Sequence, residues 1–451
     1  MRISALSAAT VAKATRLDAD YFTAPGIVAV DRIETLTRSG VDTFTIAEVG
    51  EVEHVTRFKR VLAASEEPSL PFLRAFDVFE YLPEPADLLS KGRTPDLATL
   101  LIEPGVILVT RSGRNLGPCV LADDYLAGFV PSDDLLRVRI ADVDTRLFTF
   151  AFLSSPSGQN LLRQDRTGSV IAHLSAGQVE NQTIPLLMDV FDDVVALVAE
   201  SHALRGAARR TLQGAVSAID AVTPSKPTSS LSKGWSVKAA SLAERFDAAF
   251  HQGWLAESRQ IIAGQGGVRL GDVAEVTKPG GRYKMNYVSA DHGRPLLSGR
   301  QLLQFLPIGQ KYLAASVLRV AAPYKLKSGM IAFQADGRAE ESLGQPVMVT
   351  PGRDGWLASG HVGRALPRDP ADAGWIWASI ASRAVREQIS AIACGSVVDA
   401  LYEVDLENVV LPDRSTVDSE KVTQAWIDFD RANELMSQAI GRIEQAFHGP
   451  S

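Results

Sequence analysis

Two short basic segments contain the lysine and arginine side chains of this chain that are best suited to bind phosphates or bases. HVTRFKR at 54–60 and TKPGGRYK at 277–284 each follow a strand-like run and contain no acid, so we expect basic loops. Their basic residues are Arg57, Lys59 and Arg60 in the first segment and Lys278, Arg282 and Lys284 in the second. Lysine and arginine in such loops neutralise phosphates, and arginine also pairs with guanine edges in the major groove. The segments predict DNA contacts; a solvated charged loop is the plainer interpretation of each one alone.

Four further arginines lie in segments that are similar between the two halves of the sequence. Arg74 and Arg300 lie close to each other in one pair of aligned segments, and Arg114 and Arg338 occupy the same position in another. Arg114 and Arg338 each follow a glycine in a turn-like SGR or DGR. We include all four among the candidate DNA-binding residues, while a structural capping role for Arg114 and Arg338 stays open.

The motifs of common enzymes are missing from the sequence. It has no glycine-rich phosphate loop, no GxSxG nucleophile elbow and no HExxH pair. It also lacks an NPPY-like tetrapeptide, which an amino-methyltransferase needs to hold its base, and a nuclease-like PD…ExK cluster. We therefore expect no catalytic residue, no metal ligand and no cofactor in this chain.

The basic segments belong to a longer internal duplication. Blocks at 46–52, 71–83 and 105–114 match blocks 224 residues further on, and GSVIAHLSAGQVENQTIP at 168–185 matches GSVVDALYEVDLENVVLP with an offset of 227. The order of the blocks is the same in both halves, and RLDADYF at 16–22 returns as RFDAAF. Two diverged copies of one domain explain this pattern.

Each copy ends at a proline, and a helical pattern follows it. We expect the first copy at 1–185, a central helix at 186–222, a linker at 223–234, the second copy at 235–412 and a C-terminal helix at 413–449. Ser415 with Asp418 three residues later predicts the cap of the last helix. TPSKPTSSLSKG has the composition of an exposed linker.

Both helices carry one apolar stripe with steps of three and four residues. The stripe residues are Phe191, Val194, Val198, Leu212 and Ile219 in the first helix and Val422, Trp426, Phe429, Met436, Ile440 and Ile443 in the second. A helix of about 30 residues spans about 45 Å and needs a partner along its stripe. We expect the two helices to pair like a coiled coil; the alternative is that each stripe packs on its own globular copy.

The copies mix short β-like runs with helical stretches. VILV at 106–109 and PVMVT at 346–350 read as strands, and 146–164 and 374–393 read as helices. The expected fold is therefore α/β (α+β): two similar globular domains separated by two long antiparallel helices, with pseudo-two-fold symmetry.

Composition and charge narrow the class of protein further. The net charge of −7 argues against a simple DNA-coating protein, and the helical segments 186–222 and 413–451 supply −2 and −3 of it, so the rest of the chain is close to neutral. No apolar run is long enough for a membrane span, and no signal peptide is indicated. Cys119 and Cys394 have no metal-ligand spacing, which suits a reducing cytoplasm.

The stretch FLSSPSGQNLLRQDRTGSVIAHLSAGQVENQTIP at 152–185, followed by a long helix and then the same plan again, resembles the specificity subunit of type I restriction–modification systems. The resemblance covers nearly the full chain. It is most specific in the GSV…IP block and in LGDVAEV at 270–276.

The resemblance implies a subunit without catalysis that reads a bipartite double-stranded DNA site, one target-recognition domain per half-site. The helices would form the spacer between the half-sites, and the partners would be two methyltransferase subunits, which bind S-adenosylmethionine, and in the full complex the restriction and translocase subunits. Two alternatives remain: a specificity-like subunit of another phage-defence methyltransferase system, and a protein-interaction scaffold without DNA specificity.

Overall fold

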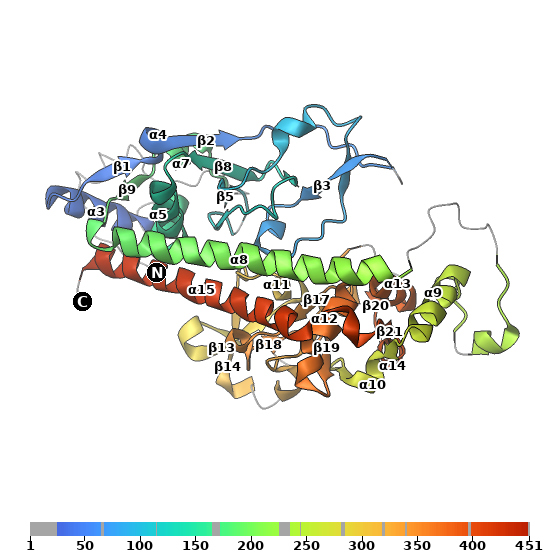
Figure 1. The fold of residues 1–451 in the computed structure, drawn as a ribbon. Coiled ribbons are helices and arrows are strands. Elements are labelled where there is room, and N and C mark those ends of the chain that lie inside the picture. The colour runs from blue at the N-terminus through green and yellow to red at the C-terminus, as the bar shows by residue number, and fades with distance from the viewer. Residues whose placement is uncertain are drawn as a thin grey trace. The chain divides into compact units, whose positions relative to one another are not determined.

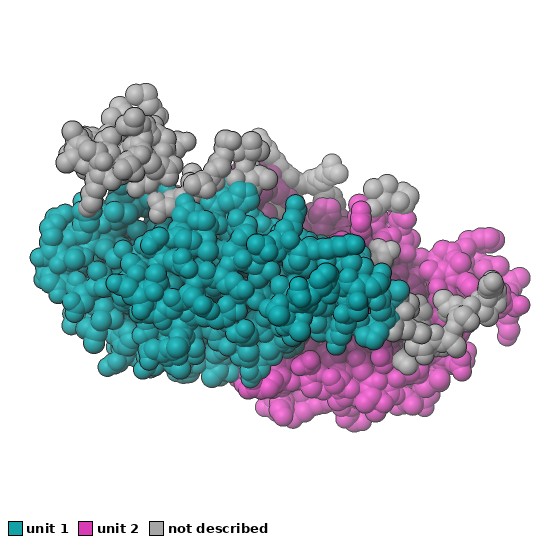
Figure 2. Space-filling model, turned by 90° about the horizontal axis from the view of Figure 1, so that it is seen from above, with its two compact units in different colours: residues 1–79, 87–206, 431–451 teal, residues 80–86, 207–430 magenta. Residues whose placement is uncertain are grey.

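The computed structural model describes residues 25–449 except 65–66, 114, 165–171, 225–234, 244, 281–284, 318–320, 339–340 and 396–397. The described chain forms two compact units, coloured separately in Figure 2. Unit 1 contains Met1–Phe79, Asp87–Gly206 and Arg431–Ser451, and unit 2 contains Glu80–Ala86 and Ala207–Asp430. This division differs from the segments expected from the sequence, because each unit takes part of both long helices.

The first copy is a mixed α/β domain (Figure 1). Its helices are α3 (Gly26–Arg38), α4 (Ile46–Val49), α5 (Val143–Ser154), α6 (Pro156–Gln164) and α7 (Ala176–Glu180). Its strands are β1 (Thr43–Thr45), β2 (Gly50–His54), β3 (Ser69–Leu73), β4 (Leu88–Ser90), β5 (Ile107–Thr110), β6 (Cys119–Leu121), β7 (Val130–Pro131), β8 (Leu135–Ile140) and β9 (Thr183–Pro185). The central sheet has the order β2-β8-β5-β6, with every neighbour antiparallel.

The second copy repeats this arrangement. Its helices are α9 (Gly253–Gly264), α10 (Leu270–Val273), α11 (Gly299–Leu302), α12 (Ala373–Ala381), α13 (Arg383–Ile392) and α14 (Glu403–Glu407). Its strands are β10 (Val268–Arg269), β11 (Ala274–Thr277), β12 (Tyr287–Val288), β13 (Gly293–Leu297), β14 (Lys311–Ala314), β15 (Ile331–Gln334), β16 (Asp336–Gly337), β17 (Pro346–Met348), β18 (Leu357–Ala358), β19 (Val362–Pro367), β20 (Asp399–Ala400) and β21 (Val410–Leu411). The sheet order β11-β19-β15-β17 matches that of the first copy strand for strand, and β10 pairs with β21 as β1 pairs with β9.

Short 3-10 helices join these elements in both copies. They are η1 (Asp77–Phe79), η2 (Leu97–Leu100), η3 (Ala239–Ala243), η4 (Ala290–His292), η5 (Ala315–Val317), η6 (Ala322–Tyr324), η7 (Pro351–Arg353), η8 (Pro370–Asp372) and η9 (Arg414–Thr416).

Local sequence explains why several of these elements form where they do. All four residues of β5 are buried, as its continuous apolar and β-branched run predicts. Asp142 caps α5 by accepting the backbone N–H of Thr145 at 2.8 Å. Ser175 and Gln178 form a reciprocal capping box at the start of α7.

Two long helices complete the fold: α8 (Met188–Val222) and α15 (Ser419–His448). In unit 1 they run antiparallel: Ser201 donates to the carbonyl of Ala432 at 2.6 Å, and Arg205 donates to Asn433 at 3.2 Å. Asp193, earlier in α8, pairs with Arg442, later in α15. The expected mixed α/β fold with two β-rich domains and packed long helices is therefore confirmed.

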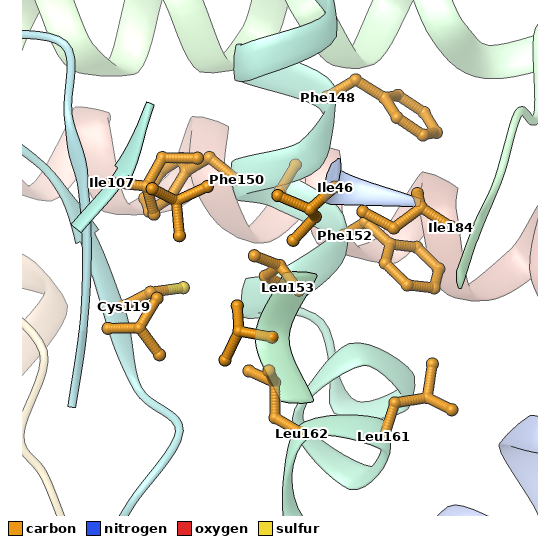
Figure 3. Packing of buried hydrophobic residues seen from close by; sticks show 14 of the residues in the cluster. Ile46, Ile107, Cys119, Phe148, Phe150, Phe152, Leu153, Leu161, Leu162 and Ile184 are labelled. Atoms are coloured by element: carbon orange, nitrogen blue, oxygen red, sulfur yellow. The ribbon is translucent and has the colours of Figure 1, made fainter. Parts of the chain in front are cut away.

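The apolar stripes of the helices pack on the globular domains as well as on each other. In unit 1, Phe191 stacks on Phe148 of α5 with ring centres 5.0 Å apart, and Phe447 meets Phe152 edge-on at 5.9 Å. Val194, Val198 and Ile443 join the same hydrophobic core, part of which Figure 3 shows. The end of the chain thus stabilises the first copy.

In unit 2 the apolar stripe of α15 packs against a tyrosine from the first copy. Tyr81 is fully buried, and its ring centre lies 4.8 Å from both Trp426 and Phe429 of α15. Arg209 of α8 donates to the carbonyl of Tyr81 at 2.8 Å, and the Tyr81 N–H donates to Leu303 at 2.9 Å. Residues 80–86 are therefore a segment of the first copy that packs in unit 2.

The remaining stripe residues divide by burial. Leu212, Ile219 and Val422 are buried, whereas Met436 and Ile440 are only half-buried. Leu435 and Ala439 are the buried residues of that turn, because the stripe shifts by one position along this part of α15.

Three local expectations differ from the structure. Ser415 does not cap α15: Asp413 accepts its backbone N–H at 2.8 Å, and Asp418 caps the helix through the N–H of Lys421 at 3.1 Å. Each expected helix around 146–164 and 374–393 is broken in two at a serine, Ser155 or Ser382, with extended backbone. Pro156 explains the first break, since a residue before proline avoids helical geometry.

We predict that Phe447→Ala destabilises the first copy although it lies at the other end of the sequence. Phe447 is fully buried in the unit 1 core, and removal of a buried phenylalanine side chain costs about 3–5 kcal/mol. Hydrogen exchange of the β5 and β8 amides should accelerate, whereas Gln438→Ala on the exposed face of α15 should leave it unchanged. Unchanged exchange in the Phe447→Ala protein would contradict this packing.

We also predict that Cys119 is inert in the native protein. Burial raises the pKa of the Cys119 thiol to about 12, and its Sγ lies 3.2 Å from Ser154 Oγ. A thiol-alkylating reagent reacts with the thiolate form of cysteine. At pH 8 we therefore expect such a reagent to modify only the half-buried Cys394. Mass spectrometry after labelling should find Cys119 modified only in denaturant; rapid native labelling at Cys119 would be the opposite result.

Candidate nucleic-acid interface

The basic loop of the first copy follows β2 directly. Arg60 forms an ion pair with Asp133 at 2.6 Å, and its guanidinium lies 4.8 Å from the centre of the Phe72 ring. Arg57 approaches the same carboxylate at 3.8 Å, yet its side chain is 86% exposed, and Lys59 is exposed too. Asp133 therefore anchors Arg60, while the charge of Arg57 remains largely in solvent, where it interacts weakly.

A second anchor holds the chain just after this loop. Arg93 binds Glu67 with its Nε at 3.0 Å from Oε1, and it donates to the carbonyl of Leu62 at 2.8 Å. The hydrogen bonds from Arg93, and then those from Ser90 and the Ala64 N–H, lower the pKa of Glu67 to about 2. The carboxylate thus stays ionised at neutral pH and keeps its ion pair with Arg93.

Polar side chains gather beside the basic loop, at the ends of β2 and β5 and before β8. We call His54, Arg111, Ser112, Asp133 and Asp134 the first polar node. Arg111 lies 2.7 Å from His54 Nε2, and its Nε donates to the carbonyl of Leu174 at 3.2 Å. Ser112 donates to Asp134 at 2.7 Å.

The second copy has a polar node in the corresponding place, formed by Lys278, Asp336 and His361. Lys278 Nζ lies 2.6 Å from Asp336 Oδ1 and 3.3 Å from the carbonyl of Leu401. His361 Nδ1 lies 2.7 Å from Asp336 Oδ2. Lys278, a candidate DNA contact, has a side chain that is only 18% exposed, and its ammonium group is occupied by this ion pair.

The backbone frame of the two nodes is the same. In the first copy the N–H of Arg111 donates to Asp134 at 3.0 Å, and in the second the N–H of Ala335 donates to His361 at 2.8 Å. The N–H of Leu174 likewise donates to Arg111, as that of Leu401 donates to Ala335. One frame therefore presents different side chains in the two copies.

The other candidate residues are placed as follows. Arg74 pairs with Asp87 at 3.3 Å and is partly exposed, and Arg300 on α11 and Arg338 after β16 are exposed. Arg114, Arg282 and Lys284 lie outside the described residues. The structure brings Arg57 and Arg60 to the first node and Lys278 to the second, and the DNA contacts of all the candidates stay predictions.

Sequence reasoning missed most residues of the nodes. Ser112 corresponds to Asp336 and Asp134 to His361, so these positions show no sequence echo. One sequence signal could have pointed to the strands next to the nodes. Arg137 and Arg364 share the offset of 227 residues, and both are buried in the central strands, β8 and β19. Arg137 donates to the Leu100 carbonyl and Arg364 to that of Tyr324, so each arginine ties a central strand to a segment outside the sheet.

Two further findings concern the described residues as a whole. No group of three or more His, Cys, Asp or Glu side chains among them could hold a metal ion. None of the helices in the described ranges is both long and apolar enough to cross a membrane.

No protein-family model matches the chain, and no curated protein matches it. Among solved structures, the chain is similar to the type I restriction–modification system S subunit from M. genitalium, with 10% identity, coverage of 90% of this chain and 96% of that chain, and a TM-score of 0.31. It is also similar to a chain from a structural study of complex assembly and conformational transition of the type I R-M system, with 17% identity and a TM-score of 0.29. That match covers 90% of this chain and 97% of the other chain. A third match is the HsdS subunit from Thermoanaerobacter tengcongensis, with 17% identity, 91% and 97% coverage and a TM-score of 0.28.

Proposed function

We propose that this chain is a non-catalytic DNA-recognition subunit of a type I restriction–modification complex, in which each copy reads one half of a bipartite site. The observation that carries the proposal is that one backbone frame recurs in two copies of the same domain and carries a different set of polar side chains in each. Basic side chains accompany both nodes: Arg57 and Arg60 in the first copy and Lys278 in the second.

Duplication suits a bipartite target. Two copies of one fold offer two similar surfaces, and a duplex offers two half-sites that similar surfaces can engage. The loop charges would fix the register on the phosphates, while the polar groups of the nodes would read base edges. The spacer role of α8 and α15 remains part of this proposal.

The partners follow from the sequence resemblance of residues 152–185. On that basis the subunit docks two methyltransferase subunits, which supply S-adenosylmethionine and the methyl transfer, and restriction and translocase subunits join the full complex. Such an assembly would act in the cytoplasm, where DNA is accessible. A scaffold that binds only proteins would show no preference for any duplex.

Removal of the first basic loop should weaken DNA binding. In Arg57→Ala/Lys59→Ala/Arg60→Ala, loss of up to three phosphate contacts should reduce the slope of log affinity against log salt by up to about 3. The second-copy variant Lys278→Ala/Arg282→Ala/Lys284→Ala should lower it by a similar amount, since one cation of each loop is already ion-paired, Arg60 with Asp133 and Lys278 with Asp336. Titration of labelled duplex at several salt concentrations measures both; wild-type slopes in both variants would rule out the loops as phosphate contacts.

Asp133→Asn should have the opposite effect. The carboxylate pairs with Arg60 and attracts Arg57, and it would also repel a phosphate brought to this loop. Neutralising it should tighten binding several-fold at low salt, with a steeper salt dependence. Asp291→Asn, an exposed acid of η4 in the second copy, is the matched control; equal or weaker binding by Asp133→Asn would contradict repulsion between this carboxylate and a phosphate.

A further inference from the structure

An exposed histidine at the second node contacts a carboxylate that also forms an ion pair with a lysine. The His361 side chain is 72% exposed, although its Nδ1 lies only 2.7 Å from Asp336 Oδ2. The other oxygen of this carboxylate binds Lys278 Nζ at 2.6 Å. Both oxygens of Asp336 are thus engaged, one by the imidazole Nδ1 of His361 and one by the ammonium group of Lys278.

This contact defines what the ring can offer. The carboxylate accepts a hydrogen bond, so Nδ1 carries the proton, and Nε2 is the nitrogen left to meet a ligand. In the neutral ring Nε2 is an acceptor, which suits the exocyclic amino group of cytosine or adenine in the major groove. A surface histidine that only adds solubility does not require a fixed carboxylate and a lysine behind it.

The first copy places other chemistry at the same position of the same frame. There Asp134 stands where His361 stands, and Ser112, which donates to it at 2.7 Å, stands where Asp336 stands. The backbone bonds from residue 111 to 134 and from residue 335 to 361 show that the two positions correspond. The frame is thus constant while the side chain at this position changes from a carboxylate to an imidazole.

We propose that His361 Nε2 contacts a base edge and so determines the sequence preference of the second half-site, with Asp336 and Lys278 as positioning residues. This inference rests on the proposed function, and it goes further by naming the reading group and its class of ligand, a base amino group. A group that reads bases changes which sequence is preferred, whereas a group that binds phosphate changes affinity for every sequence alike.

The test is a selection of bound duplexes from a pool of double-stranded DNA with a randomised centre, using the full-length chain. Wild type should enrich a split motif, and His361→Ala should lose about fivefold or more of the preference at one position in one half only. His448→Ala, a half-exposed histidine of α15 outside the second copy, should keep both halves. The other positions of the affected half, where His361→Ala should keep the wild-type preference, show in the same experiment that the second copy is folded.

Two substitutions of Asp336 test the positioning role. Asp336→Ala should lose the same half-site preference as His361→Ala, because the ring is no longer held. Asp336→Asn keeps an oxygen that accepts from Nδ1–H, so it should retain most of the preference. A merely structural role of Asp336 would lower the preference at every position of the second half-site, whereas a positioning role affects only the position that His361 reads.

The possible failures are distinguishable. If wild type enriches no split motif, the proposed function fails and this inference falls with it. If wild type enriches one and His361→Ala keeps both halves, the inference alone is wrong. If His361→Ala weakens binding to all sequences equally, the histidine contacts phosphate, and the proposed base contact is likewise overturned.

Discussion

Burial of the apolar stripes on α8 and α15 is the constraint on which the rest of the structure depends. Each helix is about 45–52 Å long at about 1.5 Å per residue, and an isolated helix with such a stripe would expose large side chains to water. The chain solves this by dividing both helices between its two compact units. Phe447 packs with the first copy and Trp426 with the second, where it meets Trp377 at 5.3 Å. The first copy is therefore completed by a helix segment that is distant in sequence, and the second by the segment that follows it directly.

At the surface, the two copies share one backbone frame but differ in the side chains on it. Buried arginines of β8 and β19 and matching backbone hydrogen bonds keep one frame in both copies. The side chains on that frame are free to differ, because they lie at strand ends and do not support the core. A recognition protein that must read two different half-sites needs this combination of a constant fold and variable outward chemistry. In the proposed function, the frame would position each copy on the DNA, and the differing side chains would select the base sequence of each half-site.

Much of the fold could be predicted from the sequence, because its signals are local or repeated. The block offsets predict two copies of one domain, and the stripe spacing predicts two long helices. Which unit covers each half of a helix could not be predicted, since Val194 and Ile219 belong to one uniform stripe although they lie in different units. The packing of Tyr81 could not be predicted either. It belongs to the first copy by sequence, yet it packs against Trp426 and Phe429 of α15.

The candidate site was predictable only in part. The basic loops are contiguous in sequence, so Arg57 and Arg60 were found, and Asp133 was not, because strand pairing brings it from 73 residues away. His361 and Asp336 meet for the same reason, through the register of β15 and β19. Long-range pairing of this kind leaves no trace in a single sequence when the paired residues differ between the copies.

The central claim is that one chain directs DNA modification to a single split sequence, with one copy for each half. Genome-wide mapping of adenine methylation in the native host, with and without this gene, tests it most directly. We predict that one bipartite motif loses its methylation in the deletion strain and regains it on complementation. Retention of every methylated motif after deletion would contradict the account.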